Sequence, residues 1–342
     1  MKSLSDKAVE RLRASAEEPD LAGTRYRLLE RVARGGMGVV YAAEDEKLER
    51  RVALKVLDVP GTDGDLANRL IREARVLARL EHPGIVPVHD VGTLADGRAF
   101  YTMKFVEGQR LDNFIETVES VQDRLRLFLR ICDAVAFAHA RGVLHRDLKP
   151  ANIMVGPFGE VLVMDWGLAK ILRGETPSAD RTADPEATIF EKPKQPGEER
   201  GSTKSSVITG HGTVMGTPGY MSPEQARGEV EVLDARSDIF SLGALLRFIL
   251  TQTTPAGIAP RLDRSLEAIC AKASAEQREA RYPAVQELGQ DVSRYLDGLA
   301  VGAHRESIFE KLTRFYRRYR FFILLILAYL VMRVILLLVL KR

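Results

Sequence analysis

The sequence contains little cysteine and little tryptophan, with two residues of the first and one of the second among 342. Cys132 and Cys270 lie far apart, and neither falls in a spacing typical of a metal site. This scarcity argues against a disulfide-stapled scaffold and against a zinc-binding fold. We therefore expect both cysteines to be reduced residues of a hydrophobic core.

A strong overall charge is also missing, because the net charge is only +3. Residues 305–342 hold nine Lys and Arg against two Glu, a local charge of +7, so the rest of the chain carries −4. Proteins that bind nucleic acid carry a basic face on the folded domain itself. A mildly acidic domain with a basic tail therefore argues against nucleic acid as a partner and favours a membrane surface.

Residues 1–24 lack an apolar run and are charged over most of their length. A signal peptide needs an apolar central region, so the sequence predicts a polar leader without one.

Residues 25–107 are rich in β-forming residues, with turn signals between the runs. The predicted strands are Tyr26–Ala33, Gly38–Asp45, Arg51–Leu57, Ile85–Val91 and Arg98–Phe105. Apolar residues recur at helical spacing over Asp65–Leu80, and His82-Pro83-Gly84 ends that helix. We expect a five-stranded sheet with one helix.

Residues 108–300 have a mainly helical pattern, so the sequence predicts an α+β chain with two lobes. The predicted helical stretches are Val121–Arg141, Asp238–Leu250 and Leu266–Leu299. Residues 173–212 are dense in Gly, Ser, Thr, Pro and charge, and we expect them to be disordered.

Residues 321–340 form an apolar run that one charge, Arg333, interrupts. As a helix the run would reach about 30 Å, the thickness of one bilayer core. A buried amphipathic helix is the alternative, but the run has no polar face. Basic residues gather in 301–320, so the positive-inside rule places residues 1–320 in the cytoplasm. We expect a single-pass helix in the cell membrane.

The run that carries the most chemistry is His145-Arg146-Asp147-Leu148-Lys149-Pro150-Ala151-Asn152, followed by Asp165-Trp166-Gly167. Phosphoryl transfer needs a carboxylate at the attacking hydroxyl and oxygen ligands for Mg²⁺ on a triphosphate. On these motifs the chain resembles a bacterial, eukaryotic-like (Hanks-type) serine/threonine protein kinase, over about residues 25–298. The resemblance implies a bilobal kinase fold, ATP and Mg²⁺, and protein substrates with Ser or Thr.

The resemblance also implies catalytic roles. Asp147 would be the base that orients and deprotonates the substrate hydroxyl, and Lys149 would neutralise charge on the transferred group. Thr217 would bridge Asp147 and Lys149, which is a mark of the Ser/Thr class. Asn152 and Asp165 would be the Mg²⁺ ligands.

Val52-Ala53-Leu54-Lys55 resembles the strand that carries the nucleotide-binding lysine of the family. Lys55 would contact the phosphates and pair with Glu73, which faces the sheet by its spacing in the predicted helix. An isolated pair of this kind would more often be two surface charges, but the order of the surrounding motifs favours the functional pair.

Two further segments resemble the family's adenine and phosphate contacts. The Gly-rich loop and its flanks would comprise Val32, Ala33, Arg34, Gly35, Gly36, Met37, Gly38, Val39 and Val40. Around the adenine the resemblance implies Ala53, Met103 as gatekeeper, Lys104 and Val106 through their backbone, and Met154 as the floor. Read alone, the loop could be a plain hairpin turn and the methionines could be ordinary core.

Regulation and support are implied as well. Arg146 beside Asp147 implies activation by phosphate on the loop, with Thr203, Ser205, Ser206, Thr209 and Thr213 as candidates. A buried Glu224–Arg281 pair is expected, and Asp238 is expected to tie a core helix to the catalytic-loop backbone.

Three departures from the family keep other interpretations open. Ala33 replaces the first loop glycine, Trp166 replaces a phenylalanine, and Thr251–Ser265 is too short for the helix usually found there. A nucleotide-binding pseudokinase scaffold is one alternative, and a small-molecule kinase is another. Membrane tethering would favour autophosphorylation between copies, so a second copy is an expected partner.

Overall fold

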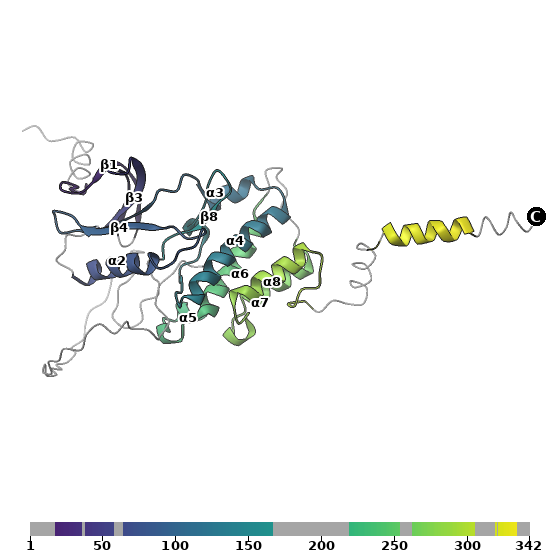
Figure 1. Cartoon of the computed structure of the whole chain (residues 1–342). Coiled ribbons are helices and arrows are strands. Elements are labelled where there is room, and N and C mark those ends of the chain that lie inside the picture. The colour runs from purple at the N-terminus through teal and green to yellow at the C-terminus, as the bar shows by residue number, and fades with distance from the viewer. Residues whose placement is uncertain are drawn as a thin grey trace, which may run out of the picture.

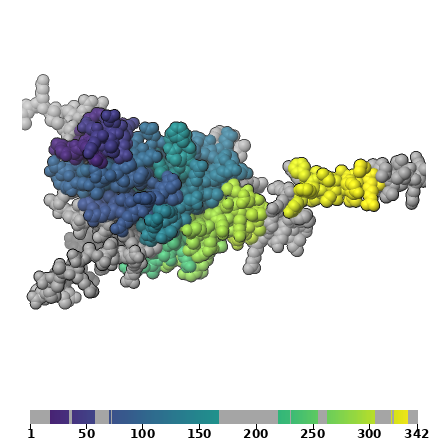
Figure 2. Space-filling model, viewed as in Figure 1, coloured from purple at the N-terminus to yellow at the C-terminus, as the bar shows by residue number. Residues whose placement is uncertain are grey.

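The computed structural model describes residues 18–35, 38–57, 64–166, 219–253, 262–304, 319 and 321–333. The folded part has two lobes that lie side by side, a sheet-based lobe and a helical lobe (Figure 1). The lobes are in direct contact along their shared boundary (Figure 2).

The first lobe is built on an antiparallel sheet in the order β1-β2-β3-β5-β4. Its strands are β1 (Tyr26–Gly35), β2 (Gly38–Asp45), β3 (Arg50–Val56), β4 (Val88–Thr93) and β5 (Ala99–Lys104). The helix α2 (Gly64–Leu77) packs against β5 and β4 (Figure 1). The predicted five-stranded sheet with one helix is confirmed.

The predicted strand Ile85–Val91 was placed three residues too early. Pro87 has no backbone N–H to donate to a ladder, and β4 begins only after it. Ile85 instead forms an isolated parallel bridge with Val163 of the other lobe. The segment before β4 therefore ties the two lobes together.

The second lobe is mainly helical, as predicted, but it also holds a small sheet that the pattern did not indicate. Its α-helices are α3 (Leu111–Phe114), α4 (Val121–Ala140), α5 (Pro223–Ala226), α6 (Ala235–Thr251), α7 (Arg264–Ala273) and α8 (Val285–Leu296). The 3₁₀ helices are η1 (Ile115–Thr117), η2 (Pro150–Asn152), η3 (Val230–Val232) and η4 (Arg278–Ala280). The small sheet has the order β6 (Gln109–Arg110), β7 (Ile153–Val155), β8 (Val161–Val163).

The predicted helical stretch Leu266–Leu299 is not continuous, because α7 and α8 are separated by residues 274–284. Arg281 in this break turns inward to an ion pair with Glu224, and Pro283 follows it. The tertiary ion pair and the proline override the helical spacing there. At the other end, α8 stops at Leu296, and Gly298 takes the left-handed conformation (φ +67°) common just after a helix.

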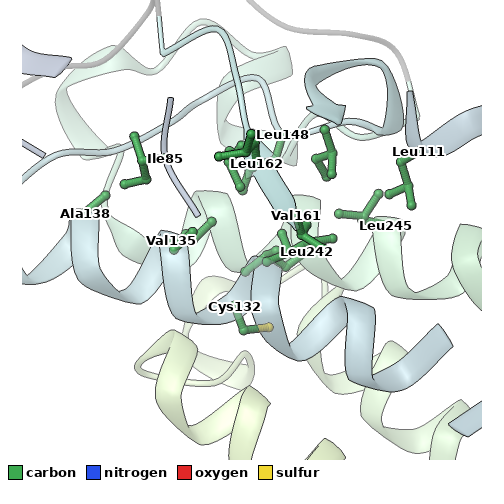
Figure 3. Close-up of a cluster of buried hydrophobic side chains, with 14 of the residues drawn as sticks. Ile85, Leu111, Cys132, Val135, Ala138, Leu148, Val161, Leu162, Leu242 and Leu245 are labelled. Atoms are coloured by element: carbon green, nitrogen blue, oxygen red, sulfur yellow. The ribbon is translucent and has the colours of Figure 1, made fainter. Parts of the chain in front are cut away.

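The hydrophobic core of the second lobe lies where α4, α6 and β8 meet. Figure 3 shows side chains of these elements turned toward one another, among them Val135, Leu242 and Leu162. Leu148 of the catalytic loop is fully buried in the same cluster. Cys132 and Cys270 are free and buried, as predicted. The catalytic loop is therefore anchored in this hydrophobic cluster.

Towards the C-terminus, residues 321–333 are helical and their large apolar side chains are exposed. Among the described residues no helix combines the length and the apolar character that a bilayer crossing needs. The remainder of the expected span, 334–340, lies outside the described residues.

Candidate active site

The residues predicted to act in catalysis come from both lobes. Lys55 is on β3 and Glu73 is on α2, while Asp147, Lys149 and Asn152 lie between α4 and β7. Asp165 is the second residue after the end of β8. Because β8 is buried in the core, its position determines the position of Asp165.

A chain of ionic contacts joins the two lobes. Lys55 Nζ lies 3.0 Å from Glu73 Oε1 and 2.9 Å from Asp165 Oδ1. Burial alone would lower the pKa of Lys55, but the Asp165 and Glu73 carboxylates outweigh it and the pKa is raised. Burial would likewise raise the pKa of Asp165, yet Lys55 keeps it below its ordinary value. The lysine is therefore charged and held between two carboxylates.

The catalytic loop brings three of its predicted residues together. Lys149 Nζ lies 2.6 Å from Asp147 Oδ2. The Asn152 amide donates to the Asp147 backbone carbonyl over 2.8 Å and to its carboxylate over 3.2 Å. The asparagine thereby fixes the orientation of the aspartate and leaves its own Oδ1 available to a cation.

Asp238 of α6 holds the backbone of this loop, as predicted. Its carboxylate accepts the N–H groups of His145 and Arg146, each over 2.8 Å. It also contacts His139 Nε2 at 2.7 Å. Burial would raise the pKa of Asp238, but its contact with His139 and its other hydrogen bonds lower it. The buried aspartate thus stays ionised and ties α6 to α4 and to the loop.

Trp166, which stands where the resemblance leads one to expect a phenylalanine, is buried in the core. Its side chain is 1% exposed, and its indole N–H donates to the Val163 carbonyl over 3.1 Å. Its ring lies 4.7 Å from the His145 ring, measured between centroids. The larger side chain therefore finds both a partner for its polar atom and an aromatic neighbour.

Arg146 is half-buried with a positive φ of 69°, and burial lowers its pKa. Its Nε and Nη2 atoms have no hydrogen-bond partner among the described residues. Two buried guanidinium nitrogens without an acceptor are costly, so this position is suited to an anion.

The residues expected around the nucleotide lie on β1, β2, β3, β5 and β7 and on residues 105–108, the link from β5 to β6 that is called the hinge below. Ala53 of β3 is the register partner of Met103 of β5, and both are buried. Val39 is buried, whereas Val40, Val106 and Met154 are half-buried. Lys104, Val32, Ala33 and Arg34 are exposed. Gly35 ends β1, while Gly36, Met37 and Thr217 lie outside the described residues.

Two glycines in this region are required by close backbone approach. A Cβ atom on Gly38 would clash with the Val56 carbonyl oxygen, and one on Gly108 would clash with that of Val155. Gly38 brings β2 onto β3 behind the loop, and Gly108 lets the hinge pass over β7.

Glu224 and Arg281 form the expected buried ion pair, with contacts of 2.7 and 2.9 Å. Ser237 donates to the same carboxylate over 2.8 Å. Burial would raise the pKa of Glu224, but Arg281 lowers it to about 2. The next residue, Gln225, donates to the Arg146 carbonyl over 2.7 Å, so this pair also supports the catalytic loop.

One contact of the site was not anticipated. The hydroxyl of Tyr101 donates to Glu73 Oε1 over 2.8 Å. The available signal was its position two residues before Met103 on the strand beside β3, but only the register of β3 and β5 identifies its partner.

Asp165 and Asn152 offer a carboxylate and an amide oxygen, the hard ligands that Mg²⁺ takes in combination with phosphate oxygens. Half of the Asp165 side chain is exposed, so a cation can reach it. The donor set therefore fits Mg²⁺, which would neutralise phosphate charge there.

The chain matches the family model "Protein kinase domain" over residues 26–301. It therefore belongs to the protein kinase domain family and is a phosphotransferase that uses ATP.

Among its relatives, the serine/threonine-protein kinase PknD of Protochlamydia amoebophila is 34% identical over 316 residues, which cover 80% of this chain and 30% of the relative. PknD of Chlamydia trachomatis serovar L2b is 36% identical over 310 residues, which cover 80% of this chain and 32% of the relative. The chain thus spans about a third of the length of these relatives.

Solved structures with the same fold include the kinase domain of Mycobacterium tuberculosis PknI. Two of them match with TM-scores of 0.52 and 0.53 at 23% identity. They cover 79% and 80% of this chain, and 95% and 96% of the PknI chains. They support the bilobal fold alone.

Proposed function

We propose that this chain is a membrane-tethered serine/threonine protein kinase that transfers the γ-phosphate of ATP, with Mg²⁺, to Ser and Thr hydroxyls. The observation that carries the proposal is the linked set of Glu73, Lys55 and Asp165 beside the Asp147–Lys149 pair. A displaced α2 or a misplaced Asp165 would break this set.

Each residue of the set has a role in the proposed reaction. Asp147 accepts the proton of the attacking hydroxyl, and Lys149 neutralises charge on the group in transfer. Lys55 holds the phosphates while Glu73 orients it. Asn152 and Asp165 hold the metal that shields the phosphate oxygens.

The proposed activation uses the half-buried Arg146, whose Nε and Nη2 atoms have no partner among the described residues and would suit a phosphate group. Autophosphorylation of the activation loop would supply that phosphate. The candidates Thr203, Ser205, Ser206, Thr209 and Thr213 lie outside the described residues. A second copy of the chain would be the phosphate donor in trans.

The proposed organisation has five parts: a leader (1–24), a first lobe (25–107), a second lobe (108–300), a basic segment (301–320) and a membrane helix (321–340). Residues 1–320, with both lobes, would lie in the cytoplasm. Residues 173–212 would be a disordered insertion of the activation loop. The support for the membrane helix is its apolar composition after a basic segment, and nucleic acid is not among the proposed partners.

A second candidate function is a nucleotide-binding scaffold with little catalysis. The observation that favours it is the short link between α6 and α7, which has no helix among its described residues. We propose that this shortened lobe limits protein docking rather than chemistry, because it leaves the Lys55–Glu73 pair intact.

The test is to incubate the full chain with ATP and Mg²⁺ and to map phosphate by mass spectrometry, with Asp147→Asn as the blank. Phosphate on Ser or Thr within 173–217 of the wild type alone supports the kinase. ATP binding without any phosphate would favour the scaffold. Flotation of the chain with lipid vesicles, lost on removal of 321–342, tests the tether separately.

A further inference from the structure

Tyr101 of β5 lies directly opposite Lys55 of β3 in the antiparallel register. Opposed residues of such a pair project from the same face of the sheet. Here that face is the one covered by α2. Tyr101 is 1% exposed, so its ring is sealed between the sheet and the helix.

The two side chains converge on a single oxygen atom. The Tyr101 hydroxyl lies 2.8 Å from Glu73 Oε1, and Lys55 Nζ lies 3.0 Å from the same atom. Glu73 is itself only 5% exposed, so water has little access to replace a lost donor. The carboxylate is therefore held by one charged and one neutral donor.

The two donors differ in the number of partners that they serve. Lys55 forms ion pairs with both Glu73 and Asp165, and bound phosphates would be a third partner for its ammonium group. Tyr101 has Glu73 as its hydrogen-bond acceptor and carries no charge that a phosphate could attract. The Lys55 ammonium also lies 5.7 Å from the centre of the Tyr101 ring, but the hydrogen bond from the Tyr101 hydroxyl to Glu73 does not run through Lys55.

We propose that Tyr101 is a positioning residue, which holds Glu73 and with it α2 against β5 independently of Lys55. Its effect on catalysis rests on the kinase function proposed above, whereas its effect on the order of α2 does not. The family pattern assigns the placement of this helix to the lysine pair, and the Tyr101 hydroxyl adds a second attachment from the neighbouring strand.

The direct test is amide hydrogen exchange of the full chain without nucleotide, comparing the wild type with Tyr101→Phe. Loss of a hydrogen bond to a buried charged group should speed exchange across α2, residues 64–77, by about tenfold or more. Tyr26→Phe is the matched control, because its buried hydroxyl donates to Asp90 over 2.9 Å elsewhere on the same sheet. Equal protection of α2 in both variants would overturn the proposal.

The second readout is autophosphorylation as a function of ATP concentration. Tyr101→Phe should lower kcat/KM for ATP by about tenfold, while Tyr26→Phe leaves it within about twofold. In a Glu73→Gln background, Tyr101→Phe should cost less than about twofold, because its partner is already altered. Additive losses in that cycle would show that Tyr101 does not act through Glu73.

The two readouts separate the two claims. If the wild type transfers no phosphate, the kinase proposal fails and the exchange comparison alone decides the role of Tyr101. If the wild type is active and α2 exchange is unchanged in Tyr101→Phe, the kinase proposal stands and the positioning role is wrong.

Discussion

The carboxylate of Asp238 accepts the backbone N–H of Arg146 over 2.8 Å, at a residue whose φ is +69°. A left-handed conformation at a non-glycine residue costs energy, so it persists only where the surroundings hold it. Asp238 lies on the buried α6, and it also accepts the N–H of His145. The shape of the catalytic loop is thus imposed from the core of the second lobe.

Replacing Asp238 by alanine should therefore lower the free energy of unfolding by about 3 kcal/mol or more, because two backbone N–H groups lose their acceptor. Phosphate transfer should fall in the molecules that remain folded. The control is Asp133→Ala, an exposed aspartate on α4, which should change stability by less than about 0.5 kcal/mol. Urea denaturation of both variants gives the comparison, and equal midpoints would contradict the role of Asp238.

The Glu224–Arg281 pair predicts a pH dependence of stability. The pKa of Glu224 falls from an ordinary value of 4.5 to about 2 in the folded chain. Its contribution is complete above about pH 4.5 and is lost as the pH falls toward 2, since the unfolded chain then binds the proton more readily. The loss should amount to roughly 3 kcal/mol.

Thermal melts between pH 7 and pH 2 measure this loss. Glu224→Gln should be less stable than the wild type at pH 7 and should show a shallower decline below pH 4.5. Parallel curves for the two proteins would mean that another carboxylate governs acid unfolding.

Arg124 of α4 is fully buried, and no carboxylate of the described residues pairs with it. Its guanidinium donates to the carbonyls of Ile249 and Gln252, each within 2.8 Å, and to those of Val118 and Ile115. It thereby caps the C-terminal end of α6, where the link to α7 is short. Burial lowers its pKa.

Arg124→Met should destabilise the chain by about 3 kcal/mol or more, because several buried carbonyls lose their donor. The stability of Arg124→Lys should lie between those of the wild type and Arg124→Met. A single ammonium group cannot reach both the carbonyls of Ile115 and Val118 and those at the end of α6. Arg126→Met on the exposed face of α4 serves as control and should be nearly neutral. Chemical denaturation that ranks the lysine and methionine variants equally would contradict this role.

Two glycines within helices predict opposite outcomes for the same substitution. At Gly289 of α8 an added Cβ would meet nothing closer than 3.8 Å, whereas at Gly243 of α6 it would collide with Ala273 and Ser274. Gly289→Ala should therefore raise the unfolding free energy by about 0.5–1 kcal/mol. Gly243→Ala should lower it by about 1–3 kcal/mol. Differential scanning calorimetry of both variants decides, and a shift of the same sign in both would refute the packing of α6 on α7.

The fold was predictable from the sequence where periodicity is long and local. The strands and helices of the first lobe, and α4, follow from alternation and helical spacing. The observed element boundaries differ from the predicted ones where a single residue or a distant partner sets them. Pro87 sets the start of β4, and the ion pair of Arg281 with Glu224 interrupts the predicted helix between α7 and α8. The small sheet β6-β7-β8 was missed because its strands are two or three residues long.

The residues of the site were recognisable from their motifs, but their partnerships depend on contacts over long sequence separations. Tyr101 reaches Glu73 only because β5 lies beside β3 under α2. Arg124 reaches the end of α6 only through the packing of α4 on α6. No local pattern encodes either contact. The roles given to the site residues remain predictions, and Gly36, Met37 and Thr217 also lie outside the described part of the chain.

The most direct test of the whole account is the single-turnover rate of phosphate transfer from ATP by the full chain, compared with Asp147→Asn at equal occupancy by ATP. The account predicts that the variant binds ATP with unchanged Kd but transfers phosphate at least about 10²-fold more slowly, because it lacks the base that orients the hydroxyl. A wild type that transfers phosphate no faster than Asp147→Asn would contradict it.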